Sequence, residues 1–283
     1  MMAVMSVNEQ RTGSRLGHRP VVGILHPGAM GAALGSALKP TAGVVIWADG
    51  SRSHATAKRA ELADLIAVPD VAALARRADL IISICPPHVA LAVAEQVVAA
   101  LADREPDSWP LYLDANAVAP ATVRRIGELL GADRVVDGAV IGPPAWERGQ
   151  SVLWLAGQRA AEVVELFAGS PFDARVLGAE LGSASALKAC FALQSKAMPA
   201  IWLEIAEAAE KAGVSEALHG ELTRVGVDLP ERLARLSSTA GPKAWRWAGE
   251  MDEAADAMVE LGLPDGFSRA AAELYRRWDA PAG

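Results

Sequence analysis

A short loop near the N-terminus has the residue types that bind a phosphate group through the backbone. The apolar run 21–25 leads into "HPGAMG", residues 26–31, and a small-residue helix is expected over 29–38. In a dinucleotide-binding loop three glycines serve the turn, the approach of the pyrophosphate and helix packing. Gly28 and Gly31 take the second and third positions, and His26 replaces the first. The predicted cofactor contacts here are His26, Pro27, Gly28, Ala29, Met30 and Gly31. The alternative is a strand–turn–helix without a ligand.

The segment "WADGSRSHATAKR" indicates which dinucleotide this loop would bind. Asp49 stands about 20 residues beyond the loop, where an acidic residue contacts the free ribose 2′-hydroxyl of NAD. Ser51, Arg52 and Ser53 follow directly, and a guanidinium fork matches a 2′-phosphate. We therefore expect contacts from these three residues and favour NADP over NAD. A solvated helix start is the alternative explanation for the basic residues of this segment.

Lys188 lies in the apolar stretch "SALKACFA". Burial disfavours a charged ammonium, so the pKa of such a lysine is lowered toward the range useful for a general acid or base. The alternative is a lysine that reaches solvent from a helix edge, and the residues alone favour that alternative. Lys196 follows two turns later, where we expect solvation or a like-charge effect on Lys188.

Composition limits the classes of partner. The chain has 283 residues, of which 52% are hydrophobic and 22% charged, so a large core is available. The net charge of -7 argues against nucleic acid and anionic membrane surfaces. The two cysteines, Cys85 and Cys190, are far apart, and no His, Asp or Glu spacing suggests a metal. No apolar run reaches the roughly 18 residues of a membrane span, so we expect a soluble, cytoplasmic protein.

Hydrophobic patterning predicts an α/β, doubly wound parallel sheet followed by helices. Strands are expected at 21–25, 43–50, 79–87, 110–120, 134–144, 151–157 and 174–178, with helices at 29–38, 53–63, 70–78, 89–102 and 121–131. Beyond residue 178 the pattern becomes helical, with one long helix over 182–212 in which Pro199 is a candidate kink. Further helices are expected at 215–226, 230–238, 242–261 and 267–278.

Several motifs together resemble the 6-phosphogluconate dehydrogenase-like superfamily, which includes β-hydroxyacid dehydrogenases and imine reductases. They are "HPGAMG" (26–31), "ICPPHVA" (84–90), "DANAVAP" (114–120), "DGAVIGPPAW" (137–146), "RWAGEM" (246–251) and "GLPDGF" (262–267). The likeness is greatest to a branch with a compact helical C-terminal domain of poorly defined function. It implies an NAD(P)-binding Rossmann domain (20–178) and a helical domain (179–283) that forms a homodimer and contributes to the substrate site. Residues 1–19, which have no continuous apolar core, are expected to be a disordered tail.

The resemblance also implies site residues. "GSASALK" (182–188) places Lys188 at the catalytic lysine, and cofactor contacts extend to Cys85, Pro86, Pro87 and Asn116. Two family features are missing, because Ala192 replaces a substrate-orienting asparagine and Ile141-Gly142-Pro143 replaces a Ser-Gly-Gly carboxylate anchor. Candidate substrate contacts are Asn116, Ile141, Gly142, Trp146, Ser195 and Trp202, with turn formation or packing as the alternative.

These inferences predict an NADP-dependent oxidoreductase that transfers hydride between nicotinamide C4 and a small carbonyl or hydroxy compound. Lys188 would be the general acid/base. One alternative is an imine reductase or reductive aminase, whose members usually carry Asp or Tyr at the lysine position. An alternative of another class is a non-catalytic NADP-binding sensor or assembly protein.

Overall fold

Parallel strands joined by helices build the N-terminal half. The structure is a computed structural model that describes residues 16–50, 52–240 and 244–279. Its sheet has the order β3-β2-β1-β4-β5-β6-β7-β8, and the first chain reversal in that order falls between β1 and β4. The strands are β1 (Val21–Ile24), β2 (Val44–Ala48), β3 (Ile66–Val68), β4 (Leu80–Ser83), β5 (Leu111–Asp114), β6 (Val135–Ile141), β7 (Ser151–Ala156) and β8 (Phe172–Gly178).

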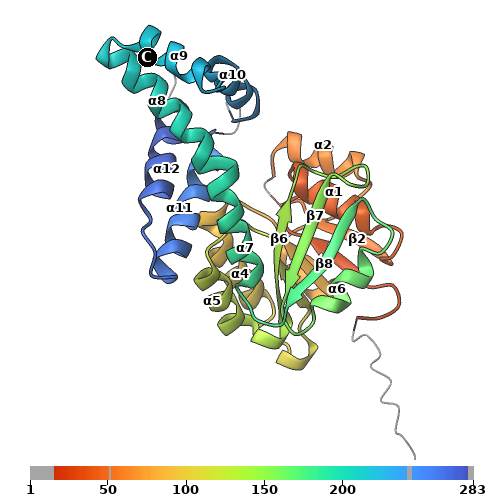
Figure 1. Cartoon of the computed structure of the whole chain (residues 1–283). Helices are drawn as coiled ribbons and strands as arrows, with labels where there is room; N and C mark the ends of the chain where they lie inside the picture. Colours follow the sequence, from red (N-terminus) through yellow and green to blue (C-terminus); the bar gives the residue numbers. More distant parts are fainter. Residues whose placement is uncertain (1–15, 51, 241–243, 280–283) are drawn as a thin grey trace, which may run out of the picture.

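Helices cover both faces of this sheet (Figure 1). They are α1 (Ala29–Leu38), α2 (His54–Leu62), α3 (Val71–Arg77), α4 (Ala90–Ala100), α5 (Pro120–Leu130) and α6 (Ala160–Leu166). One apolar core joins α1, α2 and α6 to the sheet, and a second joins α3, α4 and α5 to the other face. Apolar residues alternate between the two cores along β1, β2, β4 and β5, as strands covered on both sides require. The α/β, doubly wound prediction is confirmed.

One strand departs from the parallel arrangement. β7 runs antiparallel to β6, with Asp137 opposite Ala156 and Ile141 opposite Val152. The connection between them, residues 142–150, contains no helix, and a short loop can join only antiparallel neighbours. β8 is parallel to β7 because α6 provides the crossover. β3 and α6 are elements that the sequence analysis did not predict.

Helices form the C-terminal part, which Figure 1 shows beside the sheet and extending away from it along α8. They are α7 (Ser183–Ala192), a π-helical turn (Leu193–Ala197), α8 (Met198–Ala212), α9 (Ser215–Arg224), α10 (Leu229–Ala240), α11 (Ala244–Glu260) and α12 (Gly266–Asp279). Their core consists largely of alanines together with Leu236, Met251, Met258 and Tyr275. The long helix predicted over 182–212 is present, and its irregularity is the π turn, which ends two residues before Pro199.

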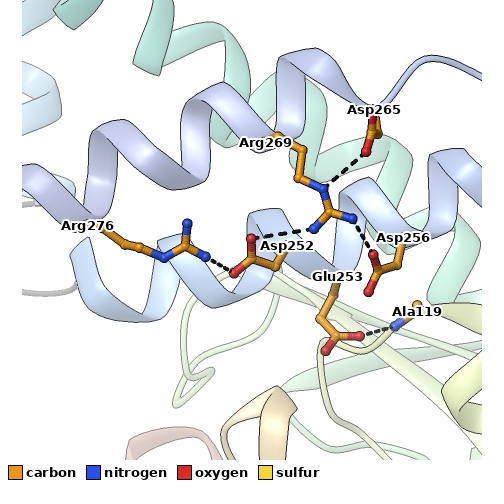
Figure 2. A network of polar contacts seen from close by, with 7 residues as sticks. All are labelled: Ala119, Asp252, Glu253, Asp256, Asp265, Arg269 and Arg276. Atoms are coloured by element: carbon orange, nitrogen blue, oxygen red, sulfur yellow. Dashed lines mark hydrogen bonds and ion pairs between the residues drawn. The ribbon is translucent and has the colours of Figure 1, made fainter.

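Charged side chains tie α12 to α11 (Figure 2). Arg269 on α12 pairs with Asp256 at 2.6 Å and Asp252 at 3.7 Å, both on α11, and with Asp265 at 3.1 Å. Arg276 pairs with Asp252 as well. These contacts hold α11 in place, and α11 packs against α7 and α5.

Candidate functional site

The loop after β1 is closely packed on one side and open on the other. The Gly28 N–H donates to the His26 carbonyl at 2.8 Å, and a Cβ at Gly31 would collide with that same carbonyl. A Cβ at Gly28 would meet nothing within 4 Å. Gly31 is therefore needed for helix packing, and Gly28 leaves room for a ligand. No side chain caps the start of α1 and no acidic residue lies in its first turn, so its backbone N–H groups can receive an anion.

His26 and Arg52 bring unused polar atoms to the adjacent ends of β1 and β2. Among the described residues, His26 Nδ1 and Arg52 Nε are buried without a hydrogen-bond partner. Burial, and secondly the Arg52 charge, lowers the pKa of His26 to about 4, so the imidazole is neutral at pH 7. Buried polar atoms without partners cost free energy unless a ligand or water completes them. These two atoms fit the polar part of a dinucleotide.

The other residues of the loop after β2 have varied surroundings. Ser53 caps α2, where its hydroxyl accepts from the Thr56 N–H at 3.2 Å. Lys58 pairs with Glu61 at 2.9 Å on the exposed face of that helix. Ser51 lies outside the described residues. Arg52 is therefore the cation of this segment that turns inward.

Asn116 joins the ends of β4 and β5. It is only 2% exposed, and its Oδ1 accepts from the Cys85 N–H at 2.6 Å. Its Nδ2 donates to Ser83 Oγ at 3.1 Å and to Asp114 Oδ2 at 2.8 Å. Burial raises the pKa of Asp114 to about 7 and that of the Cys85 thiol to about 12. Both polar atoms of the Asn116 side-chain amide are thus hydrogen-bonded within the protein, which favours a structural role for Asn116 over a substrate contact.

β6 positions Lys188 through two contacts with α7. Asp137 accepts from the Ser185 N–H at 3.0 Å and from Ser185 Oγ at 2.7 Å, which fixes the first turn of the helix. Lys188 Nζ, one turn later, donates to the Val140 carbonyl at 2.9 Å. Val140 lies near the carboxyl end of β6, which is parallel to β5. Lys188 is therefore held at the sheet edge where α/β proteins bind ligands.

Two carboxylates from α11 line the same small pocket as Lys188. They are Glu250 and Glu253, and the pocket also includes Ala117, Val118, Ala189, Ala192 and Ala254. Glu253 accepts from the Ala119 N–H at 2.7 Å, as Figure 2 shows. Burial lowers the pKa of Lys188 to about 8; Glu250 opposes this change, and Lys196 and Arg246 add to it. Both protonation states of Lys188 are thus accessible near neutral pH.

Sequence reasoning missed Asp137, Glu250 and Glu253. The last two carry no distinct signal in the sequence, since the segment of α11 contains three further carboxylates, Asp252, Asp256 and Glu260. Lys196 was expected on the surface, yet its side chain is 14% exposed and pairs with Glu250 at 2.9 Å. That expectation was wrong because α11 covers this face of the long helix.

The predicted substrate contacts lie in different places. Ile141 and Gly142 directly follow Val140, whose carbonyl accepts from Lys188, but they are not among the residues that line the Lys188 pocket. Trp146 is in the loop between β6 and β7 and is 57% exposed. Ser195 and Trp202 line a separate groove of about 400 Å³ beside α10. The structure does not bring these two to the Lys188 pocket, because the π turn changes the phase of the helix after Ala192.

Comparisons with known proteins agree with this architecture. Residues 209–278 match a family described as a domain of unknown function, DUF1932. An uncharacterized 28.5 kDa protein from the 5′ region of the 7S RNA of Methanothermus fervidus is 30% identical over 169 residues. That match spans 59% of this chain and 62% of the relative, so less than two thirds of the relative is covered.

Solved structures of similar fold cover nearly the whole chain. A conserved hypothetical protein from Sinorhizobium meliloti 1021 has a TM-score of 0.68 and 24% identity, over 95% of this chain and 91% of that one. Mycobacterium tuberculosis 3-hydroxyisobutyrate dehydrogenase, solved with L-serine, has a TM-score of 0.65 and 20% identity, over 93% of this chain and 94% of that one. A reductive aminase from Aspergillus terreus, solved with NADPH and ethyl levulinate, has a TM-score of 0.55 and 19% identity, over 92% of this chain and 93% of that one.

The fold and these matches confirm the resemblance to the superfamily of hydroxyacid dehydrogenases and imine reductases. This chain has their N-terminal Rossmann domain and a helical C-terminal part. Within that part lies the DUF1932 domain. No helix in the described part of the chain is long and apolar enough to cross a membrane. Those residues also contain no cluster of His, Cys, Asp and Glu that could hold a metal ion.

Proposed function

We propose that this protein is an NADP-dependent oxidoreductase acting on a small carbonyl or hydroxy compound. The observation that carries the proposal is Lys188, a half-buried amine at the carboxyl edge of the doubly wound sheet, whose pKa is lowered to about 8. The solved structures of similar fold include hydroxyacid dehydrogenases and reductive aminases, and this supports the proposal that the protein is an oxidoreductase.

The two loops after β1 and β2 would hold the cofactor. The uncapped start of α1 would bind the pyrophosphate, with Gly28 leaving space for it. Arg52, which no described acceptor engages at Nε, would bind the 2′-phosphate and so select NADP. When bound, a nicotinamide cofactor supplies or accepts a hydride at C4.

Lys188 would exchange the proton that accompanies hydride transfer. In reduction, its ammonium donates a proton to the substrate oxygen; in oxidation, its neutral amine accepts the hydroxyl proton. The Val140 carbonyl, which accepts from Nζ at 2.9 Å, holds the amine in place in either state. Burial of the pocket keeps the two states close in free energy.

A substrate screen tests this proposal. NADPH oxidation is measured over keto acids, aldehydes and cyclic imines with the wild type, Lys188→Ala and Lys211→Ala. Lys211 is an exposed lysine of α8 that pairs with Glu207, so its variant controls for loss of a lysine. We expect turnover to fall by about 100-fold or more in Lys188→Ala and to persist in the control. Turnover equal in all three proteins would contradict the role of Lys188.

Imine reduction is the second candidate. Its support is the missing carboxylate anchor, because Pro143 has no N–H and its carbonyl accepts from the Ser151 hydroxyl. A reductive aminase is also among the solved structures of this fold. Turnover of cyclic imines, or of a ketone only with added amine, would favour this candidate over the first.

The remaining expectations stay predictions. They are the homodimer, the cytoplasmic location and the domain limits at residues 20–178 and 179–283. A dimer through the helical part fits the surface of α9, which has no buried residue, and the exposed Met198 and Ile201 of α8.

A further inference from the structure

The π turn decides which side chain shares a face with Lys188. Two turns of a regular α-helix contain about seven residues, which would place Ser195 above Lys188. The turn Leu193–Ala197 is π-helical and holds about one residue more. Lys196 therefore takes the position that Ser195 would have had. Single π turns inside long helices occur frequently at functional sites.

The contacts of Lys196 agree with this change of phase. Lys196 Nζ lies 2.9 Å from a Glu250 carboxylate oxygen, and both side chains are 14% exposed. Glu250 in turn lines the Lys188 pocket. The Tyr275 hydroxyl donates to the Lys196 carbonyl at 2.7 Å, and the Trp247 ring lies 5.7 Å from Lys196 Nζ. The turn is thus held in a defined geometry from α11 and α12.

We propose that Glu250, held by Lys196, is a positioning residue for Lys188. The pair sets the charge that Lys188 meets in its pocket, and with it the pH range in which Lys188 exchanges a proton. This inference rests on the proposed function, in which Lys188 is the acid/base. Neither Glu250 nor Lys196 needs to touch the substrate.

The sign of each effect follows from electrostatics. A carboxylate near an amine stabilises the ammonium, and a second cation near that carboxylate reduces the stabilisation. Glu250 thus raises the pKa of Lys188, and Lys196 lowers it. Removing Glu250 should therefore lower the pKa of Lys188, while removing Lys196 should raise it. Opposite signs distinguish this role from a structural one.

The other charged groups near α7 differ in their partners. Arg246, also on α11, lies 3.9 Å from Glu250 and acts on Lys188 in the same direction as Lys196. Glu253 bonds the Ala119 N–H, and Asp137 of β6 bonds Ser185. Arg124 of α5 pairs with Glu260. Among these described groups, the Lys196–Glu250 pair is the more buried ion pair at the Lys188 pocket.

The test measures the Lys188 titration directly by NMR of the full chain labelled with 13C and 15N in lysine. The Lys188 signal is assigned by its loss in Lys188→Arg. We expect the pKa of Lys188 to fall by about one pH unit in Glu250→Gln and to rise by a similar amount in Lys196→Met. The matched control is Glu253→Gln, which removes a carboxylate from the same helix and pocket and should shift the titration by less than half as much.

A double variant keeps the test valid if Glu250→Gln fails to fold. Lys196→Met/Glu250→Gln removes both members of the Lys196–Glu250 pair, so neither is left as an unpaired charge, and the Lys188 pKa of this variant should lie below that of Lys196→Met alone. Shifts of the same sign in the two single variants would overturn the inference. So would a Glu253→Gln shift as large as that of Glu250→Gln.

This readout is separate from turnover. If no substrate is reduced, the proposed function fails while the lysine titration is still measured. If turnover depends on Lys188 but its titration ignores Glu250 and Lys196, the inference alone fails. In an active enzyme, the pH profile of kcat should shift in the same direction as the titration in each variant.

Discussion

Asp114 is a carboxyl group that the fold buries for structural reasons. It accepts from the Asn116 backbone N–H at 3.1 Å and from the Asn116 side chain, at the ends of β4 and β5. Burial raises its pKa from 3.8 to about 7. Its hydrogen bonds from Asn116 stabilise the charged carboxylate and lower the pKa, but by less than burial raises it. At neutral pH this residue is therefore close to its titration midpoint.

The titration of Asp114 should appear in the stability of the protein. Between pH 4 and 7 the folded state retains a proton that the unfolded aspartate has lost, so the free energy of unfolding falls by about 1.4 kcal/mol per pH unit. This stabilisation is complete below about pH 4 and is lost as the pH rises through about 7. Asp114→Asn removes this contribution. Urea unfolding measures the free energy of unfolding at several pH values. Relative to the wild type, that of Asp114→Asn should increase steadily between pH 4 and pH 7.

The control for that experiment is Asp103→Asn, which removes an exposed carboxylate. A difference between Asp114→Asn and wild type that does not change with pH would contradict the buried titration.

The individual residues of the site were predictable to different degrees. Gly28, Gly31 and Lys188 carry local signals, since a glycine pattern and a lysine in an apolar run are visible without tertiary structure. Glu250 and Lys196 were not predictable, because their meeting depends on how α11 packs against the long helix. Arg52 was predicted as a cofactor contact; its Nε is buried without a hydrogen-bond partner, and its role stays a prediction.

The π turn is the element on which the candidate site depends most. It has a physical cause in the sequence, since Pro199, two residues after the last residue of the turn, cannot donate the N–H that an α-helix requires. The proline predicted an irregularity in the long helix. The kind of irregularity depends on α12, whose Tyr275 bonds the Lys196 carbonyl.

Tyr275→Phe tests the stabilisation of this turn. The variant removes only the hydroxyl and keeps the ring. The centroid of this ring lies 5.3 Å from that of Trp247 and 6.3 Å from that of Trp278. We expect the free energy of unfolding to fall by about 0.5–1.5 kcal/mol, because the partly buried hydrogen bond to the Lys196 carbonyl is lost. Ser195→Ala removes a partly exposed hydroxyl from the same turn and should change stability by less than about 0.5 kcal/mol. Equal, small effects in thermal unfolding of both variants would show that the Tyr275 bond is unimportant.

Most sheet elements followed from hydrophobic runs and breakers, and those that did not have clear reasons. β3 is a strand of three residues whose first two are exposed, so it lacks a buried apolar run. The antiparallel direction of β7 could have been inferred from the missing helix between residues 144 and 151. The phase of the helix after Ala192 could not have been inferred from the sequence, since a proline alone does not specify a π turn.

Across the whole molecule, the candidate site joins segments from both halves of the chain. Arg52 and the loop at residues 26–31 come from the sheet domain, and Glu250 and Glu253 come from the helical part. Glu253 bonds the Ala119 N–H at the start of α5, and Arg124 of α5 pairs with Glu260 of α11. These contacts set the position of α11 relative to the sheet, and with it the surroundings of Lys188.

The net charge of -7 repels an anionic cofactor at long range, so its binding must depend on local groups. The described loops offer the uncapped start of α1 and the inward Arg52 for this purpose. Cofactor binding and the choice of NADP are therefore the central claim of this account.

Fluorescence titration with NADPH and NADH tests that claim most directly. We predict that NADPH binds more tightly than NADH, and that Arg52→Ala weakens NADPH binding at least about tenfold while changing NADH binding little. Arg59→Ala, which removes an exposed arginine from α2, is the matched control and should leave both affinities nearly unchanged. Binding of neither dinucleotide to the wild-type protein would contradict the account.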